Sequence, residues 1–475
     1  MVYYNRRRFL GLSAASFGAS CGMLGALASH VPVQAADTSG YKALVCIFFL
    51  GGMDNADTVL PVDQPSFDAM RNVRPDLFDG YGEGSGSSTR DRENLLELGE
   101  QAGSGGRRFG LPPNMQDLAD LYQAGDVAIV GNVGPLIVPV VRNDVLQQSK
   151  PLPRNLFSHN DQQSTWMSGD LEGIRNGWGA EFARKVIDAD PSSNGTFAAI
   201  TATTSDIFLR GAGISQFVAR EGGVDVPRIL NSRRDLGSAS DSDVVKTALE
   251  RHFASTNIRG DNFLIGDLAR SFEAARDSNE DYLSAITNSS PLATVFPSSS
   301  IGDQLKVIAN TINIRGTLNV GRQIFFATMT GFDTHDGQPN ILPVRQEQFS
   351  EAVGAFQRAM QEIGLSENVT TFTGSDFGRT MTSNGNGTDH GWGNHHFVIG
   401  GAVNGARIIG DIPDYDVGSD RYTQTAARMI PTTATEQYAA TLGRWFGLGN
   451  AELQSVFPFL GNFETPYLDL FQNSV

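Results

Sequence analysis

The sequence predicts an α/β fold in which a mostly parallel sheet carries helices on both faces. Short, continuous apolar runs, each ending at glycine or polar residues, are typical of parallel strands that are buried on both sides. Amphipathic helical patterns alternate with these runs along the chain, as in sheets whose crossovers are helices. The predicted strands are 43–50, 127–130, 324–327, 369–373 and 397–399. The predicted helices are 115–124, 346–363 and 436–445.

Residues 1–35 have the pattern of a twin-arginine export signal. Paired arginines in 5–10 (NRRRFL) precede a mildly apolar stretch, and Val33-Gln34-Ala35 places small residues where a signal peptidase reads. An uncleaved membrane anchor fits less well, because Gly, Ser and Cys interrupt the stretch. We therefore expect cleavage before Ala36 and a periplasmic or extracellular protein.

The remaining chain of about 440 residues is long enough for one large α/β domain over 36–475, or for two domains. We favour the single domain, with insertions at 79–107, a Gly/Ser-rich surface loop, and 216–300, a mostly helical excursion. Cys46 is the only cysteine after the signal, so an internal disulfide is excluded and we expect this thiol in a buried strand.

The charge of the chain argues against nucleic acid as a partner. Removing the three arginines of 1–35, a segment without acidic residues, takes the net charge from -16 to -19. After the signal no segment is apolar and long enough to span a bilayer, so we expect a soluble mature protein. The sequence does not predict its oligomeric state.

Histidines gather beside aspartates in three short patches. Six histidines follow the signal, and five of them lie in 158–161, 333–336 and 388–396. Imidazole next to carboxylate suits a divalent metal ion or a proton-transfer site. His252 stands apart on a helical pattern, and we assign it no role.

Several of the acidic residues come directly after predicted strands. Asp54 follows the first strand through Gly51-Gly52, Asp333 follows another, and Asp376 follows a third. In open α/β sheets the carboxyl ends of strands line the ligand crevice, so these carboxylates should meet at one edge. Asp54 could instead simply cap a tight turn.

The patches offer metal ligands of two kinds. Asp333 and His335 on one loop can face one cation, although a hydrogen-bonded surface turn is the alternative. His390 is the best single ligand candidate, and Asp389 either binds the metal or orients an imidazole. Of His395 and His396, we expect one to face the site or the crevice and the other to be structural.

Three residues are candidates for the chemistry itself. Ser158, at a predicted helix start, is either a nucleophile or an ordinary N-cap. His159 is a candidate ligand or proton donor. Arg379 either clamps a tetrahedral oxyanion or forms a salt bridge with Asp376.

With these motifs in place, the chain resembles a bacterial family of twin-arginine-exported proteins, the domain-of-unknown-function 1501 family, within the alkaline-phosphatase-like superfamily. The resemblance spans about Lys42 to Phe463. Its marks are 49–55 (FLGGMDN), Ser158-His159 with Gly177-Trp178, 333–335 (DTH), 376–379 (DFGR) and 387–391 (GTDHG). It implies a three-layer sandwich with a metal site at the carboxyl edge of the sheet.

The resemblance also implies roles for individual residues. By matching motif, Asp54 resembles a bridging ligand, Asp333, His335 and His390 resemble the first metal site, and Asp376 resembles a ligand of the second. Ser158 lies where the order expects the nucleophile. This chain departs from the superfamily where Phe377 stands in place of a second-site histidine, unless Asp389, His395 or His396 substitutes.

We therefore expect an exported metal-dependent hydrolase of phosphate or sulfate esters, with one or two divalent ions (Zn, Mn, Ca or Mg). Its substrate would be a small or polymeric anionic ester. The alternative is a non-catalytic extracytoplasmic binding or assembly protein that keeps the fold and a structural metal.

Overall fold

The computed structural model describes residues 36–82, 89–100, 106–169, 176–204, 206–220, 223–224, 251 and 263–472. The predicted export signal at 1–35 and His252 lie outside these residues. The described residues fall in one compact unit.

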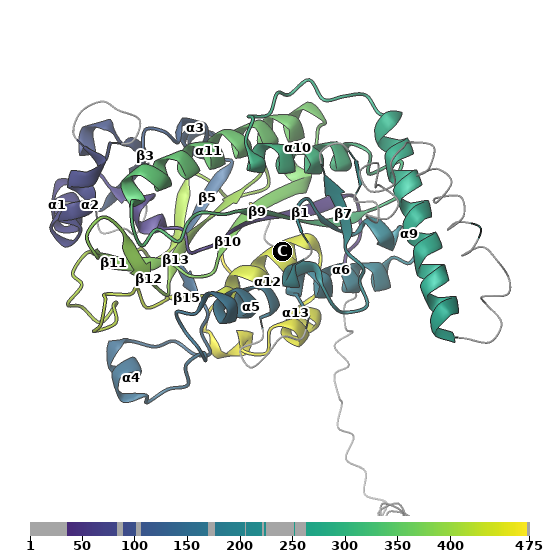
Figure 1. Ribbon diagram of the computed structural model, residues 1–475. Helices are drawn as coiled ribbons and strands as arrows, with labels where there is room; N and C mark the ends of the chain where they lie inside the picture. Colours follow the sequence, from purple (N-terminus) through teal and green to yellow (C-terminus); the bar gives the residue numbers. More distant parts are fainter. Residues whose placement is uncertain are drawn as a thin grey trace, which may run out of the picture. The chain divides into compact units, whose positions relative to one another are not determined.

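A ten-stranded sheet forms the centre of the fold (Figure 1). Its order is β14-β5-β13-β10-β1-β9-β6-β7-β8, and β15 pairs with β5. The strand bounds are β1 Lys42–Phe49, β5 Val127–Gly134, β6 Ala199–Thr201, β7 Phe217–Arg220, β8 Gly223–Val224, β9 Arg322–Met329, β10 Val369–Ser375, β13 Asn394–Ile399, β14 Arg407–Gly410 and β15 Thr433–Ala434. The five strands predicted from apolar runs are all confirmed.

The sheet is mostly parallel, with β13 as the main exception. β1 pairs in parallel with β9 and β10, whereas β13 runs antiparallel to both of its neighbours, β10 and β5. Only a small two-stranded sheet, β11 (Arg379–Ser383) with β12 (Thr388–His390), separates β10 from β13. No helix intervenes to carry the chain back across the sheet, so β13 returns in the opposite direction.

Helices cover both faces, giving the three-layer α/β sandwich (Figure 1). Along β1, Val45, Ile47 and Phe49 belong to one buried apolar cluster, while Cys46 and Phe48 belong to the other. The first face carries α3 (Gln116–Gln123), α10 (Ser300–Asn313) and α11 (Gln338–Glu362). The second carries α5 (His159–Ser168), α6 (Trp178–Ala189), α12 (Thr435–Phe446) and α13 (Asn450–Val456). Cys46 is a buried strand residue, as predicted.

The two predicted insertions contain more regular structure than the sequence suggested. The prediction of a surface loop over 79–107 is wrong for its described middle part, where β3 (Leu96–Glu100) joins a small sheet with β2 (Leu60–Pro61) and β4 (Arg108–Leu111). Leu98 is buried there, and this apolar residue outweighs the polar composition around it. Within 216–300, the long helix α9 (Phe263–Thr287) accompanies two strands, β7 and β8, that extend the main sheet.

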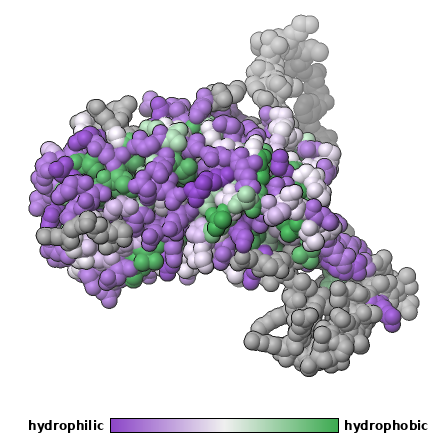
Figure 2. All heavy atoms as spheres, turned by 90° about the horizontal axis from the view of Figure 1, so that it is seen from above, coloured by the Kyte–Doolittle hydropathy of each residue, from purple (hydrophilic) through white to green (hydrophobic). Residues whose placement is uncertain are grey.

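The remaining helices lie at the periphery: α1 (Gln64–Val73), α2 (Pro75–Tyr81) and α4 (Arg142–Gln147). The face in Figure 2 is mostly hydrophilic, with apolar residues in separate small patches. Among the described helices, none is long and apolar enough to cross a membrane.

Candidate metal centre

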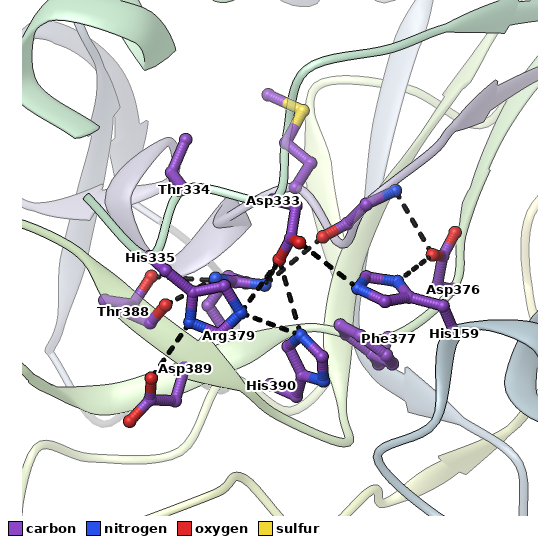
Figure 3. A network of polar contacts seen from close by, with 12 residues as sticks. His159, Asp333, Thr334, His335, Asp376, Phe377, Arg379, Thr388, Asp389 and His390 are labelled. Carbon is purple, nitrogen blue, oxygen red and sulfur yellow. Dashed lines mark hydrogen bonds and ion pairs between the residues drawn. The ribbon is translucent and has the colours of Figure 1, made fainter. Parts of the chain in front are cut away.

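Three histidines and one aspartate from three separate segments meet at the carboxyl edge of the sheet (Figure 3). Asp333 and His335 follow β9, His390 ends β12, and His159 begins α5. Trp166 fixes α5 on the sheet: its ring packs edge-on against Phe48 with centroids 5.2 Å apart. Gly374 leaves room for this ring, because a Cβ there would lie 2.3 Å from it.

The Nε2 atoms of the three imidazoles converge on the Asp333 carboxylate. His335 Nε2 lies 3.0 Å from Asp333 Oδ1, and His390 Nε2 lies 3.3 Å from the same oxygen. His159 Nε2 lies 3.5 Å from Asp333 Oδ2. The Nε2 atoms of His335 and His390 are 2.9 Å apart. We call these four residues the His/Asp cluster.

The Nδ1 atom of each imidazole lies within hydrogen-bond distance of an oxygen atom. His159 Nδ1 lies 2.6 Å from Asp376 Oδ2, and His335 Nδ1 lies 3.0 Å from Asp389 Oδ1. His390 Nδ1 lies 2.8 Å from the carbonyl oxygen of Phe157. An Nδ1 that donates to oxygen leaves the Nε2 lone pair of a neutral imidazole free to bind a metal, which is the usual arrangement of metal-ligating histidines.

This arrangement fits a divalent metal ion. With both Nδ1 atoms protonated, the Nε2 lone pairs of His335 and His390 face each other across 2.9 Å, a contact that a cation or a shared proton relieves. Neighbouring ligands of a cation bound at about 2.1 Å lie roughly 3.0–3.4 Å apart, close to the separations seen here. His159, Asp333 and His390 offer ligand atoms that all lie within 4.8 Å of one another, so they could hold a metal ion.

Electrostatics keep Asp333 ionised. Partial burial raises its pKa, but the hydrogen bond and charge of Arg379 outweigh this and leave the pKa below the ordinary value. Arg379 Nη1 donates to Asp333 Oδ1 at 2.9 Å. An ionised carboxylate is the form that binds a cation.

The pKa values of His159 and His390 are shifted in opposite directions. The hydrogen bond to Asp376 raises the pKa of His159, whereas burial lowers the pKa of His390 and favours its neutral, metal-binding form. Hydrogen bonds from Asn384 and His335 lower the pKa of Asp389 against the effect of burial. Asp389 therefore stays charged beside His335.

Two backbone features bring these segments together. Gly51 has φ of 109°, and a Cβ on it would lie 2.6 Å from the backbone nitrogen of Asp333, so only glycine fits between the loops after β1 and β9. Phe157 has φ of 74°, a strained value for an aromatic residue, and thereby aims its carbonyl at His390.

Asp54 does not belong to the cluster, contrary to the prediction that it is a metal ligand. Its Oδ2 forms a fully buried ion pair with Arg74 at 2.8 Å and also accepts from Gln338 at 3.0 Å. Its Oδ1 accepts from the backbone N–H of Asp57. The positive charge that this carboxylate faces is an arginine, which leaves no reason for a metal ion there.

The other two predicted ligands, Asp376 and Asp389, form hydrogen bonds with the Nδ1 atoms of histidines. Asp376 is buried and its Oδ2 accepts from His159, Gln163 and the Gly51 N–H, while its buried Oδ1 has no partner among the described residues. Asp389 takes the second of the two roles left open for it, orienting His335.

Ser158 and Arg379, which were predicted to take part in the chemistry, form hydrogen bonds with other groups of the protein. The Ser158 hydroxyl donates to Asp161 Oδ2 at 2.6 Å rather than to a member of the cluster. Arg379 pairs with Asp333, not Asp376, and also donates to Gly51 O and to Thr388, so four of its five N–H groups are already bound within the protein. His159 lies with the candidate metal ligands Asp333 and His390.

The expectation that one of His395 and His396 faces the site is wrong, because both are buried in β13. Asn132 N–H donates to His395 Nδ1 at 3.0 Å, and the ring of His396 stacks on Tyr438. Burial lowers their pKa values to about 4 and about 3, so both are neutral structural residues near pH 7.

The residues predicted from the sequence did not include Arg74, Phe157 or Gln338. Arg74 and Gln338 sit in helical patterns that resemble solvent-facing segments, and only the tertiary structure buries them beside Asp54. Phe157 acts through its backbone carbonyl, which no side-chain pattern reveals. Its place next to Ser158-His159 was the one available signal.

Comparisons with known proteins give one informative match. The family described as "Protein of unknown function (DUF1501)" matches residues 41–457. No curated protein matches. A crystal structure of Ps i-CgsB in complex with k-i-k-neocarrahexaose is 10% identical and has a TM-score of 0.35 over 90% of this chain and 78% of that chain, a likeness too low to carry an argument. Because the family match covers most of the chain, this protein belongs to the DUF1501 family.

Proposed function

We propose that this protein is an exported, metal-dependent hydrolase of phosphate or sulfate esters that works with one divalent ion. The observation that supports this most is the convergence of three Nε2 atoms on Asp333, with every Nδ1 held by an oxygen. His159, Asp333, His335 and His390 would hold the ion. When bound, the ion would supply a Lewis acid that polarises the ester oxygen and lowers the pKa of a bound water.

The protein's own residues would hold and expose this centre. Arg379 fixes the Asp333 carboxylate, while Asp376 and Asp389 fix two of the imidazoles. The side chains of Asp333 and His335 are 46% and 43% exposed, so water and a large ester can reach them from solvent. An open site of this kind suits a polymeric anionic ester as well as a small one.

Two further parts of the proposal rest on sequence motifs. The arginine pair in 5–10 and the small residues Val33-Gln34-Ala35 support twin-arginine export to the periplasm or beyond. Membership of the alkaline-phosphatase-like superfamily, which supports phosphate or sulfate esters as substrates, is favoured by the order of the motifs and by a His/Asp cluster at the carboxyl edge of a mostly parallel sheet.

A second candidate function is extracytoplasmic binding or assembly with a structural metal. A specific observation favours it: Asp54 is neutralised by Arg74, and the Ser158 hydroxyl is bound to Asp161. The bridging metal ligand that the superfamily implies is therefore already neutralised, and the implied nucleophile forms no hydrogen bond with the His/Asp cluster among the described residues.

Metal analysis and turnover separate the two functions. We expect the purified protein to carry about one divalent ion, and to cleave a member of a panel of phosphate and sulfate mono- and diesters supplied with Zn, Mn, Ca or Mg. Asp333→Ala should lose both the ion and turnover. Asp188→Ala, which breaks an exposed ion pair with Arg184, should keep both.

Each outcome decides between the proposals. A protein that takes up no added ion contradicts both of them. A protein whose melting temperature rises with metal but which cleaves no ester is the binding protein. Turnover that persists in Asp333→Ala would place the chemistry outside the His/Asp cluster.

A further inference from the structure

Arg428 lies directly against two residues of the metal centre. Its Nε donates to the carbonyl oxygen of His390 at 2.7 Å. Its guanidinium lies over the ring of Phe157, 4.1 Å from the ring centroid. Phe157 in turn holds His390 through its carbonyl. Arg428 is therefore attached to the cluster by two independent contacts.

Arg428 differs from Arg74 and Arg379 in that no carboxylate among the described residues lies within ion-pair distance of it. Arg74 pairs with Asp54, and Arg379 pairs with Asp333. Among the described residues, no ion pair joins Arg428 to an acid, and its remaining hydrogen bond, from Nη1, goes to the Thr425 carbonyl at 3.3 Å. The acid whose charge acts on Arg428 is Asp389, which forms its own ion pair with His335.

The side chain is also held in one orientation. Stacking on Phe157 fixes the plane of the guanidinium, and the bond to His390 fixes its rotation. Phe157, which has a positive φ, is itself contacted by Gln162, His390 and Arg428. A rigid donor binds an anion with little loss of conformational entropy.

We propose that Arg428 binds the tetrahedral oxyanion, phosphate or sulfate, of a ligand at the metal centre, using the Nη2 group that has no partner among the described residues. The geometry of guanidinium suits such oxygens, and a cation at the cluster would add a second positive charge beside it. This inference rests on the proposed metal site, but not on turnover.

The test is equilibrium binding of inorganic phosphate and of inorganic sulfate, in separate titrations, to the metal-loaded protein. We expect Arg428→Gln to weaken the preferred anion about tenfold or more with unchanged metal content. Arg428→Lys keeps the charge but lacks the planar guanidinium, so its anion affinity should lie between those of wild type and Arg428→Gln. The anion that binds more tightly in wild type identifies the class of ester.

Arg315 provides a matched control. Its guanidinium lies 5.2 Å from the ring centroid of Tyr41, next to the amino end of β1 and so at the opposite edge of the sheet. Arg315→Gln removes the same charge and a similar ring contact, so phosphate and sulfate affinity should stay at the wild-type value.

Three results would overturn the proposal: wild type that binds neither anion, Arg428→Gln with unchanged affinity, or Arg428→Gln that loses the metal as well, since Arg428 would then only position His390. Anion binding that depends on Arg428 in a protein without turnover would support this inference while overturning the hydrolase. If the protein turns over an ester and Arg428→Gln changes neither the KM nor the inhibition by phosphate, the hydrolase would be supported and this inference overturned.

Discussion

Two groups of aspartates at the same edge of the sheet differ in their partners and in their burial. Asp333, Asp376 and Asp389 face histidines, and the side chains of Asp333 and Asp389 are about half exposed, whereas that of Asp376 is buried. Asp54 and Asp57 face Arg74 and Arg90 and are almost wholly buried. A carboxylate after a strand thus becomes part of the His/Asp region, the candidate metal centre, or of an internal ion-pair network, depending on whether the rest of the chain brings a histidine or an arginine to it.

The two regions share one residue. Gln338 Nε2 donates to Asp54 Oδ2 and to Asp57 Oδ2, both at 3.0 Å. Its Oε1 accepts from Thr334 at 3.0 Å, in the loop that carries His335, and from Thr388 at 2.8 Å, in strand β12, which carries His390. The buried network can therefore support the geometry of the open cluster through a single amide.

The largest expected effect is the loss of stability when the buried network is broken. Asp54→Asn keeps the shape of the side chain but leaves Arg74 buried without a counter-charge. We expect the free energy of unfolding to fall by about 3–5 kcal/mol, measured by urea denaturation. The metal content of the folded protein should be unchanged.

The exposed ion pair of Asp79 with Arg71, 3.7 Å apart, is the control. Asp79→Asn should cost less than about 1 kcal/mol because water screens this pair. If Asp54→Asn instead retained its stability and lost a metal ion, Asp54 would be a ligand after all and the comparison between the regions would fail.

The sequence predicted the fold well because its signals are local. Apolar runs and helical periodicity located the strands and the main helices, and the rule that strand ends share an edge placed Asp333 and His335 correctly. It did not reveal which aspartates meet histidines and which meet arginines. Arg74 reaches Asp54 only through the fold, and burial of His395 and His396 in β13 depends on neighbours far along the chain, so neither leaves a local pattern.

The buried histidines provide the next contrast, through the pH dependence of stability. His395 and His396 have pKa values of about 4 and about 3 when folded, against about 6.5 when unfolded. As the pH falls below 6.5, these histidines become protonated in the unfolded state but stay neutral in the native state. The free energy of unfolding therefore decreases by about 1.4 kcal/mol per pH unit for each histidine. Denaturation between pH 6.5 and 4.5 measures this slope.

His396→Phe should reduce that slope by the share of one histidine. Tyr438→Phe is the control, because it alters the ring stacked on His396 but leaves the imidazole in place. Equal slopes in wild type and His396→Phe would mean that His396 protonates in the folded protein.

Gln338 tests whether the two regions communicate. Gln338→Leu removes the amide that joins the network to Thr334 and Thr388, and we expect metal affinity to fall about 10- to 100-fold, measured by competition with a chelator. Gln346 is the matched control on the same helix: it is buried and donates to Asp57 O and Thr58, without touching the cluster loops.

Both leucine variants leave buried polar groups without partners, so both should lose stability to a similar degree. Only Gln338→Leu should lose metal affinity. If Gln346→Leu weakened metal binding as much, the effect would be general loosening of the fold and not positioning of the loops.

The smallest expected effect concerns the orientation of one ligand. Asp389→Asn keeps an oxygen for His335 Nδ1 but removes the charge, and we expect metal affinity to fall about tenfold by the same competition measurement. Asp336→Asn removes an equal charge from an exposed side chain one residue after His335. An equal loss in both variants would assign the effect to the general field around the cluster. A loss confined to Asp389→Asn would assign it to the hydrogen bond that aims His335, because that contact is what distinguishes the two carboxylates.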